Sequence, residues 1–279
     1  MTYVVFDIGG TKTRIATSTD LKSFDEVKSY KTPPTFKAGM QLFVETVNSL
    51  TGDVTAIAGG VRGRLLEDKS GIENDGVLTK WAGESIVGYL TKEYGDIKIF
   101  LENDTAIAGV GEAVFGAGEN LPIVAYHTVS TGVGGVKIED GLIDQAHNGF
   151  EPGHQILDID RTILGEDITP TLENMVSGTA IKNRFGVEPY EIPQSDVLWN
   201  DLAGYLAQGL RNTILYWSPD AIVLGGSMII GDPAIKIDTI RKATSDALDN
   251  FEETPLIAEA KLGDEAGLWG GLAILARRL

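Results

Sequence analysis

In the first half of the chain, the spacing of apolar and polar residues predicts strands that alternate with helices. Strands are predicted at residues 3–8, 13–19, 54–58 and 97–101. Residues 38–50 place Leu42, Val47 and Leu50 roughly on one face, which predicts an amphipathic helix. Residues 103–116 are typical of a capped helix lined with Ala and Gly, and such small residues permit close approach to another backbone.

The pattern restarts at residue 121. Residues 122–131 predict a strand, 132–135 a turn, and 136–143 a further pair of strands. A long helix is predicted at 196–217, followed by a strand at 221–224; its apolar register consists of Leu202, Leu206, Leu210 and Ile214. The last segment begins with acidic residues and ends with arginines, which complements a helix dipole. We expect domains at 1–117 and 118–265, with the C-terminal helix, 266–279, packing back on the first.

An apolar strand runs into a Gly-Gly pair three times. The pairs are Gly9-Gly10, Gly134-Gly135 and Gly225-Gly226, and the first two are predicted to occupy equivalent places in two strand-turn-strand units. A single pair indicates only a turn. Polar neighbours strengthen the case, because a turn without a Cβ lets a phosphate approach the backbone amides while a hydroxyl adds a donor. Those neighbours are Asp7, Thr11 and Lys12 at the first pair, and Ser130 and Thr131 at the second.

Composition narrows the class of protein. The chain has 279 residues, 43% of them hydrophobic, which suits two domains of ordinary size. It has no apolar run long enough to span a membrane and no visible secretory signal, so we expect a cytoplasmic protein. It has no cysteine, so disulfides, thiolate metal sites and a Cys nucleophile are excluded. The net charge of −17 argues against nucleic-acid binding.

Seven motifs occur in the order seen in the ROK family of bacterial sugar kinases and sugar-responsive repressors, and the resemblance covers essentially the whole chain. They are DIGGTKTRIA, ENDTAIAGVGEA, STGVGG, EPGH, LENMVSG, PDAIVLGGSMI and DEAGLWGG. The resemblance implies an α/β, two-lobed actin-like ATPase (ribonuclease H-like) fold with an interlobe cleft, and a homodimer. ATP would lie across the cleft, with the sugar near its floor.

The same resemblance implies a role for each motif residue. Asp104 would be the general base for a sugar hydroxyl, and Asp7 would hold Mg²⁺ through water. The residues expected to bind ATP and its phosphates are Asp7, Gly9, Gly10, Thr11, Lys12, Thr131, Gly132, Gly225, Gly226 and Ser227. Those expected to bind the sugar are Gly63, Asn103, Asp104, Glu151, His154 and Glu173.

Plainer interpretations stand beside these roles. Taken alone, Asp7 is most often a turn cap, Asp104 a helix N-cap, and a lone histidine such as His154 a structural hydrogen-bonding group. His127 lies within a predicted strand and is interpreted as structural, whereas His147 has no assigned role.

The chain departs from the family pattern at several points. Many members carry a cysteine-rich zinc motif just before the glutamate that corresponds to Glu173. The absence of this motif here predicts that the protein has no such zinc site. Arg62 stands where a proline is usual, Val77 where a sugar-facing asparagine is frequent, and Phe150 where a glycine is common. These changes are predicted to cluster on the sugar side, while the ATP side is intact.

The sequence therefore predicts an ATP- and Mg²⁺-dependent kinase acting on the 6-hydroxyl of a hexose. Glucose is the first hypothesis; fructose, mannose and an N-acetylhexosamine remain open, as does polyphosphate in place of ATP. One rival is a sugar-sensing repressor, disfavoured because the first strand begins at Tyr3, with no helix-turn-helix before it, and the charge is acidic. The other is a sugar-binding regulatory protein that kept the fold without catalysis.

Overall fold

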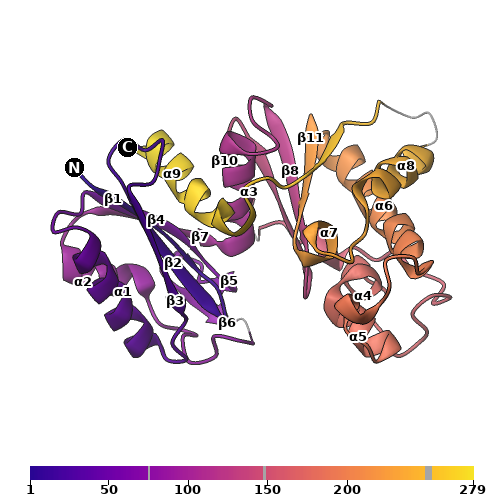
Figure 1. The fold of residues 1–279 in the computed structure, drawn as a ribbon, viewed down its shortest axis with the longest axis horizontal. Coiled ribbons are helices and arrows are strands. Elements are labelled where there is room, and N and C mark those ends of the chain that lie inside the picture. The colour runs from indigo at the N-terminus through magenta and orange to yellow at the C-terminus, as the bar shows by residue number, and fades with distance from the viewer. Residues whose placement is uncertain (75, 147–148, 249–252) are drawn as a thin grey trace. The chain divides into compact units, whose positions relative to one another are not determined.

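The computed structural model describes residues 1–74, 76–146, 149–248 and 253–279 (Figure 1). It divides into two compact units. Unit 1 comprises Met1–Val114 and Asp264–Leu279, and unit 2 comprises Phe115–Gly263. None of the helices in these described ranges combines the length with the apolar composition needed to cross a membrane.

Unit 1 is built on a five-stranded sheet in the order β3-β2-β1-β4-β7. Strand β1 pairs antiparallel with β2 and parallel with β4, which in turn pairs parallel with β7. The strands are β1 (Tyr3–Ile8), β2 (Lys12–Ser18), β3 (Glu26–Lys31), β4 (Ala56–Val61) and β7 (Lys98–Asn103), with a separate small hairpin of β5 (Arg64–Leu65) and β6 (Ile72–Asn74). The helices are α1 (Phe36–Leu50), α2 (Ile86–Tyr94), α3 (Asp104–Phe115) and α9 (Ala266–Arg278).

Strand alternation decides which face of this sheet receives each side chain of β1. Phe6 packs edge-on against Phe43 of α1, with 5.2 Å between ring centroids, in the same core as Val4 and Ile8. Val5 and Asp7 point to the opposite face, where α9 lies (Figure 1). Helix α9 approaches closely because it presents glycines: a Cβ at Gly271 would lie 2.9 Å from a methyl carbon of Val5.

Unit 2 repeats the same connectivity, with a five-stranded sheet in the order β10-β9-β8-β11-β12. Strand β8 pairs antiparallel with β9 and parallel with β11, as β1 does with β2 and β4. The strands are β8 (Ile123–Val129), β9 (Val133–Glu139), β10 (Leu142–Ile143), β11 (Ala221–Gly225) and β12 (Leu256–Glu259). The helices are α4 (Leu172–Val176), α5 (Gly178–Phe185), α6 (Leu198–Trp217), α7 (Ser227–Ile230) and α8 (Ile237–Leu248), with 3₁₀ turns η1 (Pro152–His154), η2 (Pro189–Glu191) and, at the junction of the units, η3 (Gly263–Glu265).

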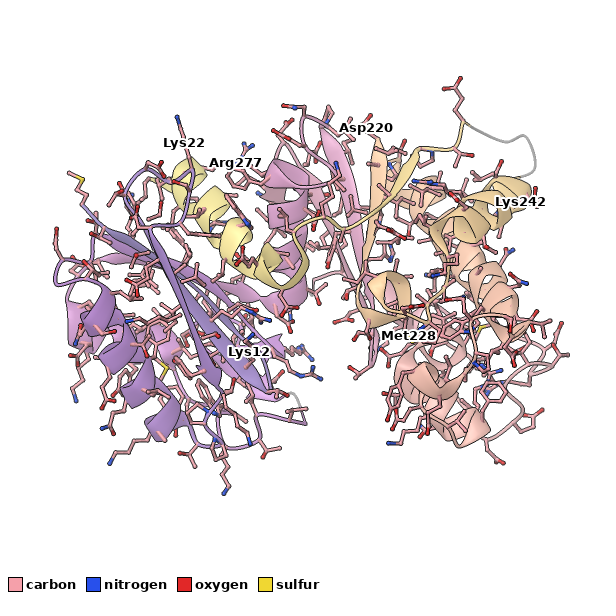
Figure 2. All side chains as sticks on the ribbon, viewed as in Figure 1. Lys12, Lys22, Asp220, Met228, Lys242 and Arg277 are labelled. Atoms are coloured by element: carbon pink, nitrogen blue, oxygen red, sulfur yellow. The ribbon has the colours of Figure 1, made fainter. Side chains whose placement is uncertain are left out.

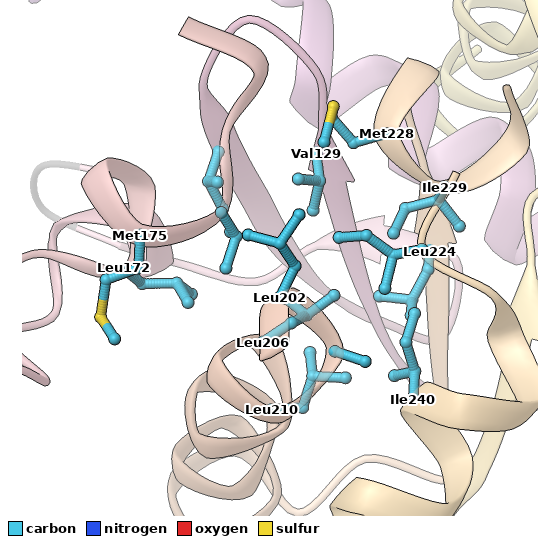
Figure 3. Packing of buried hydrophobic residues seen from close by; sticks show 14 of the residues in the cluster. Val129, Leu172, Met175, Leu202, Leu206, Leu210, Leu224, Met228, Ile229 and Ile240 are labelled. Carbon is cyan, nitrogen blue, oxygen red and sulfur yellow. The ribbon is translucent and has the colours of Figure 1, made fainter. Parts of the chain in front are cut away.

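The apolar stripe predicted for the long helix forms the core of unit 2. Leu202, Leu206 and Leu210 of α6 are fully buried, in a cluster with Leu224 of β11 and Ile240 of α8 (Figure 3). Burial of these side chains contributes roughly 1.5–3 kcal/mol each. The structure agrees here with the register expected from the sequence.

The three Gly-Gly pairs have three different structural causes, and the predicted equivalence of the first two is wrong. Gly9-Gly10 lies in the turn between β1 and β2, whereas Gly134-Gly135 lies inside β9, beyond the turn. A Cβ at Gly135 would lie 2.6 Å from a ring carbon of Pro152, so close packing explains that glycine. Gly226 precedes α7 with φ +88°, a conformation that a side chain would strain.

Candidate functional site

The β1–β2 turn is held by its own backbone and by two threonines. The Gly9 N–H donates to the Lys12 carbonyl at 3.0 Å, and the Thr32 hydroxyl donates to the Gly9 carbonyl at 2.7 Å. The Thr13 hydroxyl lies 2.9 Å from that of Thr32. Thr11 and Lys12 are exposed at the tip (Figure 2). The structure therefore brings the predicted phosphate-binding residues of unit 1 into one short, internally braced hairpin.

Asp7 lies at the carboxyl end of β1 in an acidic environment. Its side chain is 18% exposed, and Arg14, directly opposite on β2, places Nη1 3.4 Å from Oδ2 of Asp7. The same guanidinium also pairs with Asp264, just before α9. The pKa of Asp7 is raised to about 7, chiefly by burial; the charges of Asp104 and Asp264 also raise it, and Arg14 lowers it. The arrangement therefore favours a cation or a proton beside Asp7.

Asn103, rather than Asp104, caps helix α3. Its Oδ1 accepts the backbone N–H groups of Thr105 at 2.9 Å and Ala106 at 3.2 Å. Its Nδ2 donates to the Gly63 carbonyl at 3.0 Å, and Gly63 has φ +108°. Asp104 is the first residue of the helix, so the plain N-cap interpretation of Asp104 is wrong. The predicted sugar-binding residues of unit 1 lie together at the carboxyl end of β7.

Two of the three departures from the family pattern pack against the β1–β2 turn. A Cβ at Gly10 would lie 2.7 Å from Cγ1 of Val77 and 3.4 Å from Cδ of Arg62, so both side chains contact this turn. The third departure, Phe150, lies in unit 2, edge-on to Trp217 at 5.1 Å between ring centroids. Phe150 thus has a packing role that the sequence did not reveal.

The β8–β9 turn of unit 2 is surrounded by hydroxyl and backbone groups. The Ser130 N–H donates to the Gly132 carbonyl at 2.9 Å, and the Ser130 hydroxyl lies 3.0 Å from that of Ser227. A Cβ at Gly226 would lie 2.3 Å from the Val129 carbonyl oxygen, so α7 begins directly against the end of β8. The predicted nucleotide-binding residues of unit 2 therefore also meet around one turn; they are Thr131, Gly132, Gly225, Gly226 and Ser227.

The EPGH segment folds as a 3₁₀ turn against β9. Pro152 and Gly153 are buried, and a Cβ at Gly153 would lie 2.2 Å from the Val133 carbonyl oxygen. Glu151 and His154, on either side, are exposed. The small middle residues thus anchor the turn and leave the two polar side chains accessible for hydrogen bonding.

Glu173, on α4, contacts the second hairpin directly. Its Oε2 accepts the Val133 N–H at 2.8 Å, and a Cβ at Gly132 would lie 2.6 Å from the same oxygen. The sequence motif alone assigned Glu173 only a role toward the sugar. Sequence reasoning also missed Arg14 and Asp264, although the hairpin register places Arg14 opposite Asp7.

His127 is a buried structural residue, as expected. Burial lowers its pKa to about 4, so the ring is neutral at pH 7; its Nε2 lies 3.1 Å from the Thr213 hydroxyl. Its ring stacks on Trp217. His147 lies outside the described residues.

A buried carboxylate organises residues 158–164, close to the segment where the resemblance would place a zinc motif. Asp158 accepts backbone N–H groups from Thr162 at 3.0 Å, Ile163 at 3.1 Å and Leu164 at 2.7 Å. Desolvation raises the pKa of Asp158, but these backbone bonds outweigh it and lower the pKa below its ordinary value. In the described ranges, no three His, Asp or Glu side chains gather as a preformed metal site.

Comparison with known proteins defines the class to which this fold and these motifs belong. The fold is that of the actin-like ATPases, because solved structures with this fold superpose over the full chain. The ROK hexokinase from Thermus thermophilus matches with a TM-score of 0.83 and 25% identity, covering 100% of this chain and 99% of that one. A ROK family glucokinase from Streptomyces griseus, solved with glucose and AMPPNP, matches with a TM-score of 0.76 and 24% identity, covering 100% of both chains.

The family itself is shown by sequence. The ROK family model matches residues 3–278, so the chain belongs to the ROK family. Among its curated relatives is a fructokinase from Pediococcus pentosaceus, 28% identical over 205 residues, or 70% of this chain and 69% of that protein. The resemblance expected from the motifs is therefore confirmed, and similarity to sugar kinases supports hexose phosphorylation.

Proposed function

We propose that this protein transfers the γ-phosphoryl group of ATP to the 6-hydroxyl of a hexose, with Asp104 as the general base. The observation that carries the proposal is the proximity of two carboxylates at the carboxyl edge of one sheet. Asp7 is the penultimate residue of β1 and Asp104 follows β7, and the charge of Asp104 raises the pKa of Asp7. Open α/β sheets place ligands at this edge. One carboxylate would serve the phosphate side and the other the hydroxyl.

To attack the phosphoryl group, the sugar hydroxyl needs little more than correct positioning and a general base. Asn103 fixes the start of α3 and links it to Gly63, so Asp104 lies at a braced helix terminus, where its Oδ1 accepts the Thr105 N–H at 2.8 Å. Phosphoryl transfer requires alignment and neutralisation of charge more than covalent help from the protein. Asp104 would accept the proton of the sugar hydroxyl as that oxygen attacks. Asn103 and Gly63, with Glu151, His154 and Glu173 of unit 2, would orient the sugar.

The phosphates would be held by the two glycine turns. In unit 1 the donors would be the turn at Gly9 and Gly10, with the exposed Thr11 and Lys12 at its tip. In unit 2 the donors would be backbone and hydroxyl groups of Thr131, Gly132 and Ser227. Gly225 and Gly226, expected from the resemblance to lie beside the adenosine, pack closely against Tyr126 and Val129.

Magnesium fits the donor set of unit 1. A single carboxylate is sufficient, because Mg²⁺ keeps several waters and takes its other ligands from substrate phosphates. Asp7 is that carboxylate. Burial is the main reason for its raised pKa, but the neighbouring charges of Asp104 and Asp264 also contribute, and those charges would favour a divalent cation. Bound there through water, Mg²⁺ would neutralise charge on the phosphates; Asp7 would orient its water shell.

Fructose and glucose are the first sugars to test. The Pediococcus relative is named as a fructokinase and the Streptomyces structure as a glucokinase, so these names support a hexose without choosing one. A sugar-binding regulatory protein without catalysis is the second candidate, because the family also includes regulators. The homodimer and the use of ATP rather than polyphosphate remain predictions from the resemblance.

Hexose-dependent release of ADP tests the proposal. The purified protein should be assayed with MgATP against fructose, glucose, mannose and N-acetylated hexosamines, and the product's phosphorylated position determined by NMR. We expect at least one hexose to be converted to its 6-phosphate. Sugar binding without turnover of any of them would favour the regulatory alternative.

A further inference from the structure

The α4–α5 segment is tied to the β8–β9 turn at several points. The Gly178 N–H, which opens α5, donates to the Ser130 carbonyl at 2.7 Å, and the Thr179 N–H donates to the Thr131 carbonyl at 3.4 Å. From α4, the Glu173 carboxylate accepts the Val133 N–H at 2.8 Å. The turn is therefore held from its carbonyl side by one helix and from its amide side by the other.

These contacts form one small structural block. The Ser177 N–H donates to the Glu173 carbonyl at 3.0 Å, and the Ser177 hydroxyl accepts the Ala180 N–H at 3.1 Å, so the end of α4 is also the cap of α5. Movement of Glu173 would therefore move both helices' contacts with the turn. The close fit of Gly132 leaves the carboxylate little room to shift without moving the turn.

We propose that Glu173 is a positioning residue for the β8–β9 turn, holding it in the shape that receives the nucleotide phosphates. This inference rests on the proposed function and adds a second role to a residue that motif resemblance places at the sugar. The two roles are compatible: Oε2 is bonded to Val133, while Oε1 has no hydrogen-bond partner among the described residues. A sugar hydroxyl at Oε1 and the turn amide at Oε2 would share one carboxylate, and sugar and nucleotide would be linked through it.

The alternative is that Glu173 contacts the sugar and nothing else of consequence. The two can be separated without any sugar present, because only the positioning role affects the ligand-free turn. Removing the acceptor leaves the Val133 N–H without its partner, and Val133 is 4% exposed.

The test uses Glu173→Ala, Glu173→Asp and Glu173→Gln, with Asn174→Ala as the matched control. Asn174 is the next residue of α4, and its side chain donates to the Thr169 carbonyl, away from the turn. In sugar-free protein, amide hydrogen exchange over residues 129–136 and the equilibrium affinity for Mg²⁺·AMP-PNP are measured.

Glu173→Ala should speed exchange in the turn and weaken AMP-PNP binding, each about tenfold, the scale of one charged hydrogen bond. Glu173→Asp should behave like the alanine variant, because it keeps the charge but loses the reach, and it decides the matter if the alanine variant does not fold. Glu173→Gln should have exchange rates and AMP-PNP affinity close to those of the wild type, since its amide oxygen can accept the same N–H. Asn174→Ala should be indistinguishable from the wild type in both measurements.

Unchanged turn exchange and unchanged AMP-PNP affinity in Glu173→Ala and Glu173→Asp would overturn the inference and leave Glu173 a sugar ligand only. If wild-type protein itself fails to bind AMP-PNP, the proposed function is wrong at the nucleotide. Hydrogen exchange still decides in that case whether Glu173 positions the turn.

Discussion

The two hairpins, β1–β2 and β8–β9, share a connectivity and differ in chemistry. Each connects the central strand of a five-stranded sheet to an antiparallel neighbour. Around the first lie the carboxylates of Asp7, Asp104 and Asp264, partly offset by Arg14. Around the second, the described contacts come from serine hydroxyls and backbone N–H groups, with the Glu173 carboxylate bonded to the turn.

This difference suggests a division of labour: the two hairpin regions have the same topology but different roles in binding and catalysis. Carboxylates can hold a hydrated cation or accept a proton, whereas N–H groups and hydroxyls hold anionic oxygens. Both turns would contact the phosphates, but only the first hairpin region would also supply the carboxylates for the metal and the general base. The fold supplies the two positions, and the side chains around each decide its role.

The largest expected effect is on the general base. Asp104→Asn should lower kcat by roughly 10²–10⁴-fold on the best sugar, because the amide cannot accept the hydroxyl proton. Sugar affinity should fall much less. Steady-state kinetics measures both, with Asp53→Asn, an exposed aspartate of the same unit, as the control. Near-wild-type turnover by Asp104→Asn would show that the base lies elsewhere.

A smaller effect is expected from the charge of Asp7 on the stability of the ligand-free protein. The folded pKa of Asp7, about 7, lies above its ordinary value of 3.8, so folding favours the protonated form. The stability it contributes is complete below about pH 4 and is lost as the pH rises through 7. Asp7→Asn, which stays neutral, should therefore be more stable than wild type at pH 8, by on the order of a few kcal/mol.

Thermal melting from pH 5 to pH 8 measures this difference. The advantage of Asp7→Asn in Tm should narrow toward pH 5, where wild-type Asp7 is itself protonated. Asp264→Asn is the matched control, because it removes a largely exposed carboxylate from the same arginine and should gain less. A variant that is less stable than wild type at pH 8 would mean that the Asp7 charge stabilises the fold.

The smallest expected effect is that of chelation on the fold. The resemblance would place a zinc motif shortly before Glu173, and residues 158–164 at this point are held by Asp158 and its backbone bonds. Treatment with EDTA should therefore leave the Tm of the ligand-free protein unchanged. Asp158→Ala, which removes the acceptor, should lower it. A Tm that falls on chelation and recovers with one equivalent of zinc would contradict this account.

Local pattern was sufficient for the elements with strong apolar signals. The first strand has the bounds expected from its sequence, 3–8, and the helices expected at 38–50 and 196–217 agree within two residues. Strand β3 was missed because it is a partly exposed edge strand of mixed polar composition. The role of Gly134-Gly135 was also mispredicted: the pair lies inside β9, and Gly135 packs against Pro152, which is distant in sequence.

The candidate site shows the same limit. Motifs name Asp7 and Asp104, since each ends a predicted strand or begins a predicted helix. They do not reveal that Arg14 joins Asp7 to Asp264, because Arg14 and Asp264 lie 250 residues apart in the sequence. Nor do they reveal that Glu173 holds the Val133 N–H, a contact made only by tertiary folding.

The division of labour is tested most directly by the effect of Mg²⁺ on nucleotide affinity. AMP-PNP is titrated into wild type and Asp7→Asn by calorimetry, with and without Mg²⁺. The account predicts that Mg²⁺ strengthens binding to wild type, and that Asp7→Asn loses this gain while keeping its metal-free affinity. If Asp7→Asn retains the full gain from Mg²⁺, the cation is not held at Asp7, and the assignment of separate roles to the two hairpins is wrong.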